Sequence, residues 1–212
     1  MPTIKLAIIY YSSTGTNYQL AQWAAESAES ADAEIRIRKV EELAPQEAID
    51  SNRLWKKHAE ATQDVPVASL DDLDWADAII FSMPTRYGNL PSQMKQFLDS
   101  TGPLWAEGKL TNKIVSGMTS AINPHGGQEA TLLSLYTTMY HWGTIVVTPG
   151  YTDPAFSKAG GNPYGTSVAV DPESGKMKDD VREAVSQQTK RVLEVAGWVK
   201  KGESELVEGA IK

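Results

Sequence analysis

The 212-residue chain has no cysteine, three histidines and three phenylalanines. Without cysteine, a disulfide framework, a thiolate zinc site and a cysteine nucleophile are all excluded. The histidines His58, His125 and His141 show no metal-ligand spacing such as H-E-x-x-H, so no metal site is predicted. The lack of cysteine is neutral to mildly favourable for a cytoplasmic location.

Long runs of one residue type are also missing. No window approaches the roughly 20 apolar residues that span a bilayer, and the opening MPTIKLAIIYYSS has too short an apolar stretch for a signal peptide. The net charge is −7, from 20 basic and 27 acidic side chains, and neither sign forms a long block. Nucleic-acid binding needs a basic face. We therefore expect a cytoplasmic protein without a membrane segment or a nucleic-acid partner.

The chain does contain a regular alternation of strand-like and helix-like apolar patterns. Strands are predicted over residues 4–11, 33–40, 78–82, 112–120 and 143–150. Helices are predicted over residues 17–30, 91–101, 127–142 and 178–200. This alternation is typical of an α/β fold, here a doubly wound parallel sheet of five strands with helices on both faces.

Two segments interrupt the alternation: residues 41–69 before the third strand and residues 151–176 after the fifth. Loops of this length in a compact domain are functional lids, assembly elements or disordered segments. No repeat or linker divides the chain. Residues 1–200 are therefore predicted to form a single domain with two insertions, and residues 201–212 a frayed polar tail.

The first predicted strand ends in the polar cluster SSTGTN. Ligands of open α/β sheets bind beyond the carboxyl ends of the strands, and a helix that begins there offers unpaired N–H groups to an anion. A plain helix N-cap is the alternative. The Rossmann and P-loop patterns are both absent. We predict a site for one phosphate, built without lysine or arginine from Ser12, Ser13, Thr14, Gly15, Thr16 and Asn17.

Several motifs resemble a known family. SSTGTN resembles the phosphate loop of flavodoxins, which bind flavin mononucleotide (FMN). PTRYGNLPSQMKQFLDSTGPLWAEGKL, residues 84–110, resembles the flavin-ring loop of the WrbA family of NAD(P)H:quinone oxidoreductases, and GGQEATLLSLYTTMYHWG and GGNPYG are similar to that family too. The resemblance covers essentially the whole chain. It implies a flavodoxin-like sheet of order 2-1-3-4-5, FMN as cofactor, and NADH or NADPH as electron donor.

The loop after the third strand is predicted to contact the flavin ring. Backbone N–H groups and the Arg86 guanidinium would face the pyrimidine edge, where a reduced flavin carries negative charge. A surface ion pair is the alternative role for Arg86. The predicted contacts from this loop are Pro84, Thr85, Arg86, Tyr87 and Gly88.

The loop after the fourth strand is implied to cover the ring from the other side. Thr119, Ser120 and Ala121 are the predicted contacts there. Residues 122–125 depart from the glycine-rich family pattern, so no contact is carried over to them. Thr14 also departs from the pattern, which has a tyrosine implicated in nicotinamide binding, and that contact is not predicted either.

The resemblance implies two further site residues. Trp105 matches a tryptophan of the substrate site, and His141 matches a histidine that contacts the flavin across a subunit boundary. A neutral imidazole there could orient an acceptor or transfer a proton, so His141 is the predicted catalytic residue. The alternatives are core or interface packing for Trp105 and a helix cap for His141.

Together these assignments predict an FMN-dependent NAD(P)H dehydrogenase (quinone), a flavoprotein that reduces quinones by two electrons in a ping-pong mechanism. The alternative is a flavodoxin-type electron-transfer protein without quinone reductase activity, a class that tends to be smaller and to lack the two insertions. A DNA-repressor accessory role is disfavoured by the acidic balance. Surplus aromatic residues and the family's typical assembly predict a homotetramer, with a homodimer as the alternative.

Overall fold

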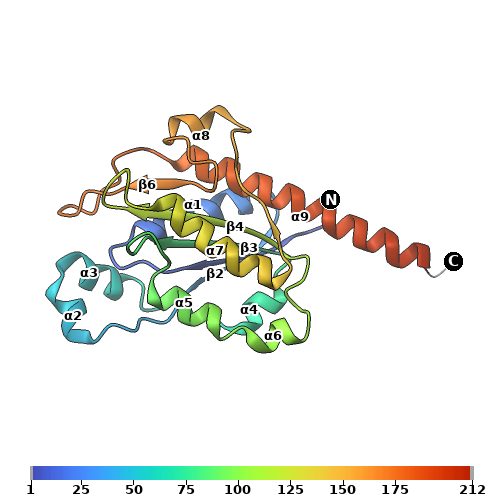
Figure 1. Ribbon diagram of the computed structural model, residues 1–212, viewed down its shortest axis with the longest axis horizontal. Helices are drawn as coiled ribbons and strands as arrows, with labels where there is room; N and C mark the ends of the chain where they lie inside the picture. The colour runs from blue at the N-terminus through green and yellow to red at the C-terminus, as the bar shows by residue number, and fades with distance from the viewer. Residues whose placement is uncertain (1, 211–212) are drawn as a thin grey trace.

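The computed structural model describes residues 2–210, and its centre is a parallel sheet (Figure 1). The sheet has the predicted order β2-β1-β3-β4-β5, and an additional strand, β6, pairs with β4. The bounds are β1 Lys5–Tyr10, β2 Glu34–Lys39, β3 Ala78–Pro84, β4 Ile114–Ala121, β5 Ile145–Val146 and β6 Ser167–Ala169. The predicted fold class is confirmed, with β6 as an unpredicted strand.

Side chains of the central strands alternate between two hydrophobic cores, because successive residues of a strand point to opposite faces. Leu6 and Ile8 of β1 pack into one core, and Ala7 and Ile9 into the other. A sheet buried on both faces needs continuous apolar strands, which explains why IKLAIIYY shows no polar alternation.

Helices cover both faces of the sheet. One core packs against α1 (Thr16–Glu29), α8 (Pro154–Lys158) and α9 (Arg182–Ala210). The other packs against α4 (Leu70–Trp75), α5 (Ser92–Asp99), α6 (Gly102–Ala106) and α7 (Gln128–Trp142). The insertion at 41–69 holds α2 (Gln46–Ser51) and α3 (Arg53–Ala61), which lie together at one end of the molecule (Figure 1). Within residues 2–210, no helix is long and apolar enough to cross a membrane.

The last strand position of the sheet is shared between β5 and β6. β5 pairs with the beginning of β4 and β6 with its end. Between them, the Gln188 side-chain amide of α9 donates to Ser116 Oγ (2.8 Å) and to the Gly117 carbonyl (2.9 Å), and its oxygen accepts from the Thr166 N–H (2.7 Å). A side-chain amide thus replaces the missing ladder bonds, and the predicted strand 143–150 is reduced to two residues.

The expected frayed tail after residue 200 is corrected. Helix α9 does not end at residue 200 but continues to Ala210 and extends beyond the rest of the fold (Figure 1). No proline interrupts this stretch, and a Lys201–Glu205 pair at i,i+4 supports it. The predicted insertion at 151–176 contains α8 and β6, so of the alternatives offered for it disorder does not apply.

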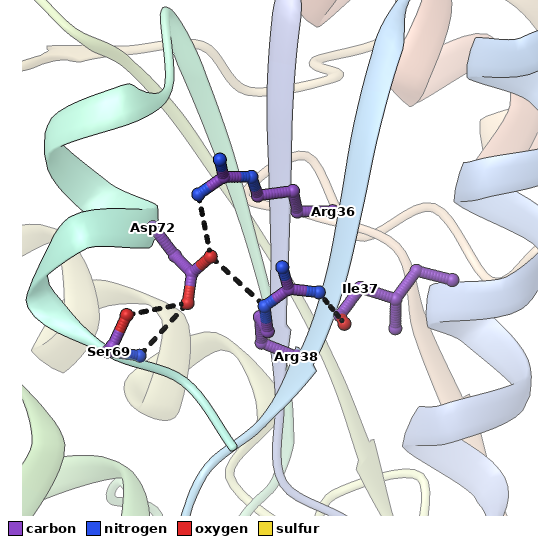
Figure 2. Close-up of polar contacts among 5 residues, drawn as sticks. All are labelled: Arg36, Ile37, Arg38, Ser69 and Asp72. Atoms are coloured by element: carbon purple, nitrogen blue, oxygen red, sulfur yellow. Dashed lines mark hydrogen bonds and ion pairs between the residues drawn. The ribbon is translucent and has the colours of Figure 1, made fainter. Parts of the chain in front are cut away.

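The edge strand β2 carries two arginines on a face that packs against α4. The Asp72 carboxylate accepts from Arg36 Nη1 (3.1 Å), Arg38 Nε (3.0 Å), and the Ser69 N–H and hydroxyl (both 3.0 Å), as Figure 2 shows. Burial alone would raise the pKa of Asp72, but the hydrogen bonds from Ser69 and the two arginines together hold that pKa below its ordinary value. One carboxylate therefore fastens the edge strand to α4.

We expect Asp72→Asn to lower the free energy of unfolding by about 1–3 kcal/mol at pH 7, because the Asp72 side chain is only 5% exposed and its charge has four donors. A lowered pKa stabilises the fold above the unfolded-state pKa of about 3.9. The difference between the two proteins should therefore shrink as the pH falls below about 4. Urea unfolding at several pH values measures it.

The matched control is Asp99→Asn, which breaks the exposed i,i+4 pair with Lys95. Exposed pairs contribute little, so a change within about 0.5 kcal/mol is expected. Equal losses for the two variants would contradict the role given to Asp72.

Candidate functional site

A cleft of about 520 Å³ opens at the carboxyl edge of the sheet. Its walls come from the loops after β1, β3 and β4 and from both insertions. The lining residues are Ser12, Ser13, Thr14, Thr16, Asn17, Asn52, Leu54, Pro84, Thr85, Arg86, Tyr87, Ser120, Ala121, Ile122, Asn123, Gly126, Val170, Asp171, Pro172 and Gly175. Most of the residues predicted to bind a cofactor are thus gathered in one place.

The loop after β1 turns sharply into α1. Gly15 has φ = 98°, a left-handed conformation that favours glycine, and its N–H donates to Ser12 Oγ (3.0 Å). Helix α1 begins at the next residue, so the N–H groups of its first turn have no partner within the helix. Gly15 itself does not line the cleft; it shapes the turn that presents these groups.

Thr16 is the first residue of α1 and carries an unpaired polar group. Its side-chain hydroxyl is buried and has no hydrogen-bond partner in the described structure, yet Thr16 lines the cleft. A buried hydroxyl without a partner is costly and is uncommon in folded proteins. The hydroxyl and the helix N-terminus together fit an oxyanion such as a phosphate group.

Asn17 lines the cleft, but its side chain is engaged inside the fold. Its side-chain amide is buried. The amide nitrogen donates to Ser82 Oγ (3.3 Å), and the amide oxygen accepts from Ser120 Oγ (2.6 Å). The backbone carbonyl of Asn17 accepts from Ser82 Oγ (3.0 Å). The side chain therefore links α1 to β3 and β4. Only its backbone N–H, in the first turn of α1, remains for an anion.

The loop after β3 forms a tight turn at Arg86–Asn89. Tyr87 and Gly88 have φ values of 53° and 76°, the signs that a type I′ turn requires. The N–H groups of Thr85, Arg86 and Gly88 donate to Ser120 O (2.8 Å), Asn89 O (2.9 Å) and Thr85 Oγ1 (3.2 Å). The expectation that these three N–H groups face a ring is therefore corrected, because β4 accepts from Thr85 and the turn accepts from Arg86 and Gly88.

What the turn does present is the Arg86 side chain and the fully exposed Tyr87 ring. Arg86 Nη2 donates to Ser13 Oγ (3.2 Å), which joins the loop after β3 to the loop after β1. Arg86 is the only cationic side chain on the cleft wall in residues 2–210, and no ion pair of it occurs there. The alternative role in a surface ion pair is not observed.

The loop after β4 supplies Ser120 and Ala121 as predicted, but not Thr119. Thr119 is fully buried below the cleft, and its N–H donates to the Thr166 carbonyl (3.0 Å). Instead, the wall continues through Ile122 and Asn123, in the segment to which no contact was assigned. Two of the residues that depart from the glycine-rich family pattern, Ile122 and Asn123, therefore line the cleft.

Both insertions contribute to the wall, which the sequence did not reveal. Asn52 and Leu54 come from the beginning of α3, and the turn at 171–175 lies against them: a Cβ on Gly175 would stand 3.2 Å from Leu54 Cδ1 and 4.0 Å from the Thr14 carbonyl. The two insertions thus meet beside the phosphate loop. The sequence did contain a signal for the start of α3, because asparagine is a preferred helix N-cap. The Asn52 side chain accepts from Leu54 N (3.0 Å) and Trp55 N (3.1 Å).

Glu42 fastens the first insertion to the site. Its carboxylate accepts from Tyr11 Oη (3.1 Å), Trp55 Nε1 (3.2 Å) and Gln93 Nε2 (2.7 Å). These donors belong to the end of β1, to α3 and to α5. Burial, and then the Glu42 charge, raise the pKa of Tyr11 above its ordinary value, so its phenol stays protonated and keeps donating.

Trp105 and His141 do not line the cleft within one chain. Trp105 Nε1 donates to the His141 carbonyl (2.9 Å), so the two residues are neighbours. His141 lies in the last turn of α7, which begins at the carboxyl edge of the sheet and ends beside the start of β5. A 15-residue helix is about 22 Å long, so the pair stands at the opposite edge from the cleft.

Comparisons with known proteins agree with this geometry. A family model described as NADPH-dependent FMN reductase matches residues 4–156. The chain is 50% identical over 192 residues to NAD(P)H dehydrogenase (quinone) of Deinococcus radiodurans, covering 91% of this chain and 95% of that protein. It is 38% identical over 205 residues to a protein of the same name from Aromatoleum aromaticum, covering 94% and 99%.

The fold is similar to the crystal structure of a flavodoxin, WrbA-like protein from Agrobacterium tumefaciens. The TM-score is 0.61, with 23% identity over 92% of this chain and 99% of that one. The resemblance stated from the sequence motifs is confirmed. The chain belongs to the NADPH-dependent FMN reductase family.

Proposed function

We propose that the protein is an FMN-dependent NAD(P)H:quinone oxidoreductase that reduces quinones by two electrons. The observation that carries the proposal is the cleft in which a helix N-terminus and the unpaired Thr16 hydroxyl meet beside Arg86. Family membership and the names of the relatives from Deinococcus radiodurans and Aromatoleum aromaticum support it.

The phosphate of FMN would bind at the loop after β1. Ser13, Thr14 and Thr16 offer hydroxyls there, and the first turn of α1 offers N–H groups and a partial positive charge. The Ser12 hydroxyl stabilises the loop itself, because its oxygen accepts from the Gly15 N–H. A dianion is thus held chiefly by neutral donors.

The flavin ring would lie between the loops after β3 and β4. Arg86 would place its guanidinium at the ring edge, Tyr87 would offer an aromatic face, and Ile122 an apolar one. Bound FMN would supply the redox chemistry between NAD(P)H, a hydride donor, and a quinone, which takes up two electrons and two protons to become a hydroquinone. The residues of this chain bind and orient the substrates and keep water out of the cleft.

The first test concerns the Thr16 hydroxyl. We expect Thr16→Val to raise the dissociation constant of FMN by about tenfold or more, because a hydrogen bond to a charged phosphate is lost. Without FMN the variant should be at least as stable as the natural protein, since the hydroxyl has no partner to lose. Quenching of FMN fluorescence gives the affinity, and urea unfolding gives the stability.

Thr137→Val is the matched control, because the Thr137 hydroxyl is exposed and donates to Leu133 of its own helix. It should leave the FMN affinity unchanged. An unchanged FMN affinity in Thr16→Val, combined with a loss of stability, would show a purely structural role for this hydroxyl.

The second test separates an enzyme from an electron carrier. A single cleft that serves NAD(P)H and a quinone in turn predicts ping-pong kinetics, seen as parallel lines in double-reciprocal plots. Initial rates are measured anaerobically with NADH or NADPH and benzoquinone, with protein stripped of FMN as the control. Bound FMN without quinone-dependent turnover would favour the flavodoxin-type carrier instead.

Trp105 and His141 could take part in the reaction only if subunits assemble. Trp105 is 58% exposed and is hydrogen-bonded to His141, and both residues lie away from the cleft of their own chain. We propose a homotetramer in which this pair approaches the cleft of a neighbouring subunit, where Trp105 would contact substrate and His141 the flavin. The cytoplasmic location remains a prediction.

Sedimentation velocity should give a species of four times the 23.1 kDa chain mass. Trp105→Ala should lower kcat/KM for the quinone by about tenfold, because an apolar wall of that size is lost, and should leave FMN affinity unchanged. Trp198→Ala, at another exposed tryptophan, is the control. A monomer that shows full quinone turnover would refute the shared site.

A further inference from the structure

The two insertions meet at the end of the cleft that the loop after β1 forms. Asn52 and Leu54 of the first insertion and Gly175 of the second line this end. A Cβ on Gly175 would stand 3.2 Å from Leu54 Cδ1 and 4.0 Å from the Thr14 carbonyl oxygen, so Gly175 lies against both. Packed atoms therefore bound the cleft beside the loop to which the phosphate of FMN is assigned.

A hairpin holds the second insertion at this end. The N–H groups of Asp171 and Gly175 donate to the carbonyls of Lys176 (2.9 Å) and Asp171 (2.9 Å). The Val170 N–H donates to the Ala121 carbonyl at the end of β4 (2.8 Å), which attaches the hairpin to the sheet. The turn of this hairpin is therefore part of an ordered wall.

The first insertion uses its own donors to hold its position. The Asn52 side chain accepts from the N–H groups of Leu54 (3.0 Å) and Trp55 (3.1 Å) at the start of α3. The Trp55 indole N–H in turn donates to the Glu42 carboxylate (3.2 Å). Helix α3 consequently contributes the apolar Leu54 side chain to the wall, and its two capped N–H groups are not free to bind an anion.

The charges on the wall also disfavour a second phosphate. Asp171 lines the cleft, and its carboxylate accepts from the N–H (2.8 Å) and the hydroxyl (2.7 Å) of Ser174. These hydrogen bonds lower the pKa of Asp171 below its ordinary value, so the carboxylate is charged at pH 7. Among residues 2–210, Arg86 is the only cationic side chain on the wall, and it is bonded to Ser13. A second phosphate would add negative charge to a wall that already carries a carboxylate.

We propose that Leu54, Gly175 and Asp171 are specificity-determining residues, which admit a flavin with a terminal phosphate and exclude flavin adenine dinucleotide (FAD), whose phosphate continues into a second nucleotide. Leu54 and the backbone at Gly175 occupy space that the second nucleotide would need, and Asp171 repels its additional phosphate. This selectivity rests on the proposed function, since it concerns the site assigned to FMN. It gives the two insertions a common role.

The ratio of the FAD to the FMN dissociation constant measures the selectivity, and calorimetric titration of protein stripped of flavin gives both constants. In the natural protein the ratio should be at least about 100, because space and charge both oppose FAD. Leu54→Ala should lower the ratio by about tenfold, because it opens the end of the cleft. Asp171→Asn keeps an acceptor for Ser174 but removes the charge, and should lower the ratio by about threefold at low salt and by less at high salt.

Leu43→Ala is the matched control, because Leu43 is an exposed leucine of the same insertion and does not line the cleft. Its ratio should equal that of the natural protein. Leu54→Met preserves the side-chain volume and should keep the selectivity. Circular dichroism verifies that each variant is folded.

An unchanged ratio in Leu54→Ala, or equal affinities of the natural protein for FMN and FAD, would overturn the proposed selectivity and leave FMN binding intact. An unchanged ratio in Asp171→Asn would overturn the role of its charge. Failure of the natural protein to bind FMN at all would instead count against the proposed function, and the selectivity would be refuted with it.

Discussion

The site depends on one buried side chain, the amide of Asn17. It connects the beginning of α1 to Ser82 of β3 and Ser120 of β4, and β3 lies between β1 and β4 in the sheet. Since the amide has both a donor and an acceptor engaged, α1 cannot rotate or slide without breaking buried hydrogen bonds. The N–H groups of its first turn are consequently aimed at one place, beyond the ends of the central strands.

Two unusual backbone features lie at or beside the cleft. Tyr87 has a positive φ although it is not glycine. Gly127 lies so close to the loop after β3 that a Cβ on Gly127 would stand 2.5 Å from Gly88 Cα. Such strain persists only where surrounding contacts enforce it, and it concentrates at functional sites. Here the enforcing contacts are the Thr131 and Thr85 hydroxyls, which are hydrogen-bonded to each other at 2.6 Å.

The sequence was sufficient for features that depend on local patterns. Continuous apolar runs predicted the strands that both cores bury, and the small polar cluster after the first run was correctly placed on the wall of the cleft. It was not sufficient where distant segments meet. The Thr119 N–H donates to the carbonyl of Thr166, which lies 47 positions later in the sequence. The wall residues Asn52 and Gly175 come from two insertions whose packing no periodicity encodes. β6 was missed because three residues give too short a pattern. The residue before it, Thr166, is held by Gln188 of the distant helix α9.

Arg86 connects the two ends of the cleft, which are formed by the loop after β1 and the loop after β3. The phosphate end relies on neutral donors fixed by the backbone, so its field changes little when groups nearby titrate. Arg86 is exposed and reaches from the ring loop to Ser13 of the phosphate loop, so the one positive charge is shared between both ends. Binding of a phosphate at Ser13 would compete for this guanidinium with the ring edge. If FMN binds as proposed, the same guanidinium would serve its phosphate and its ring, so a change at Arg86 would affect both ends of the cleft.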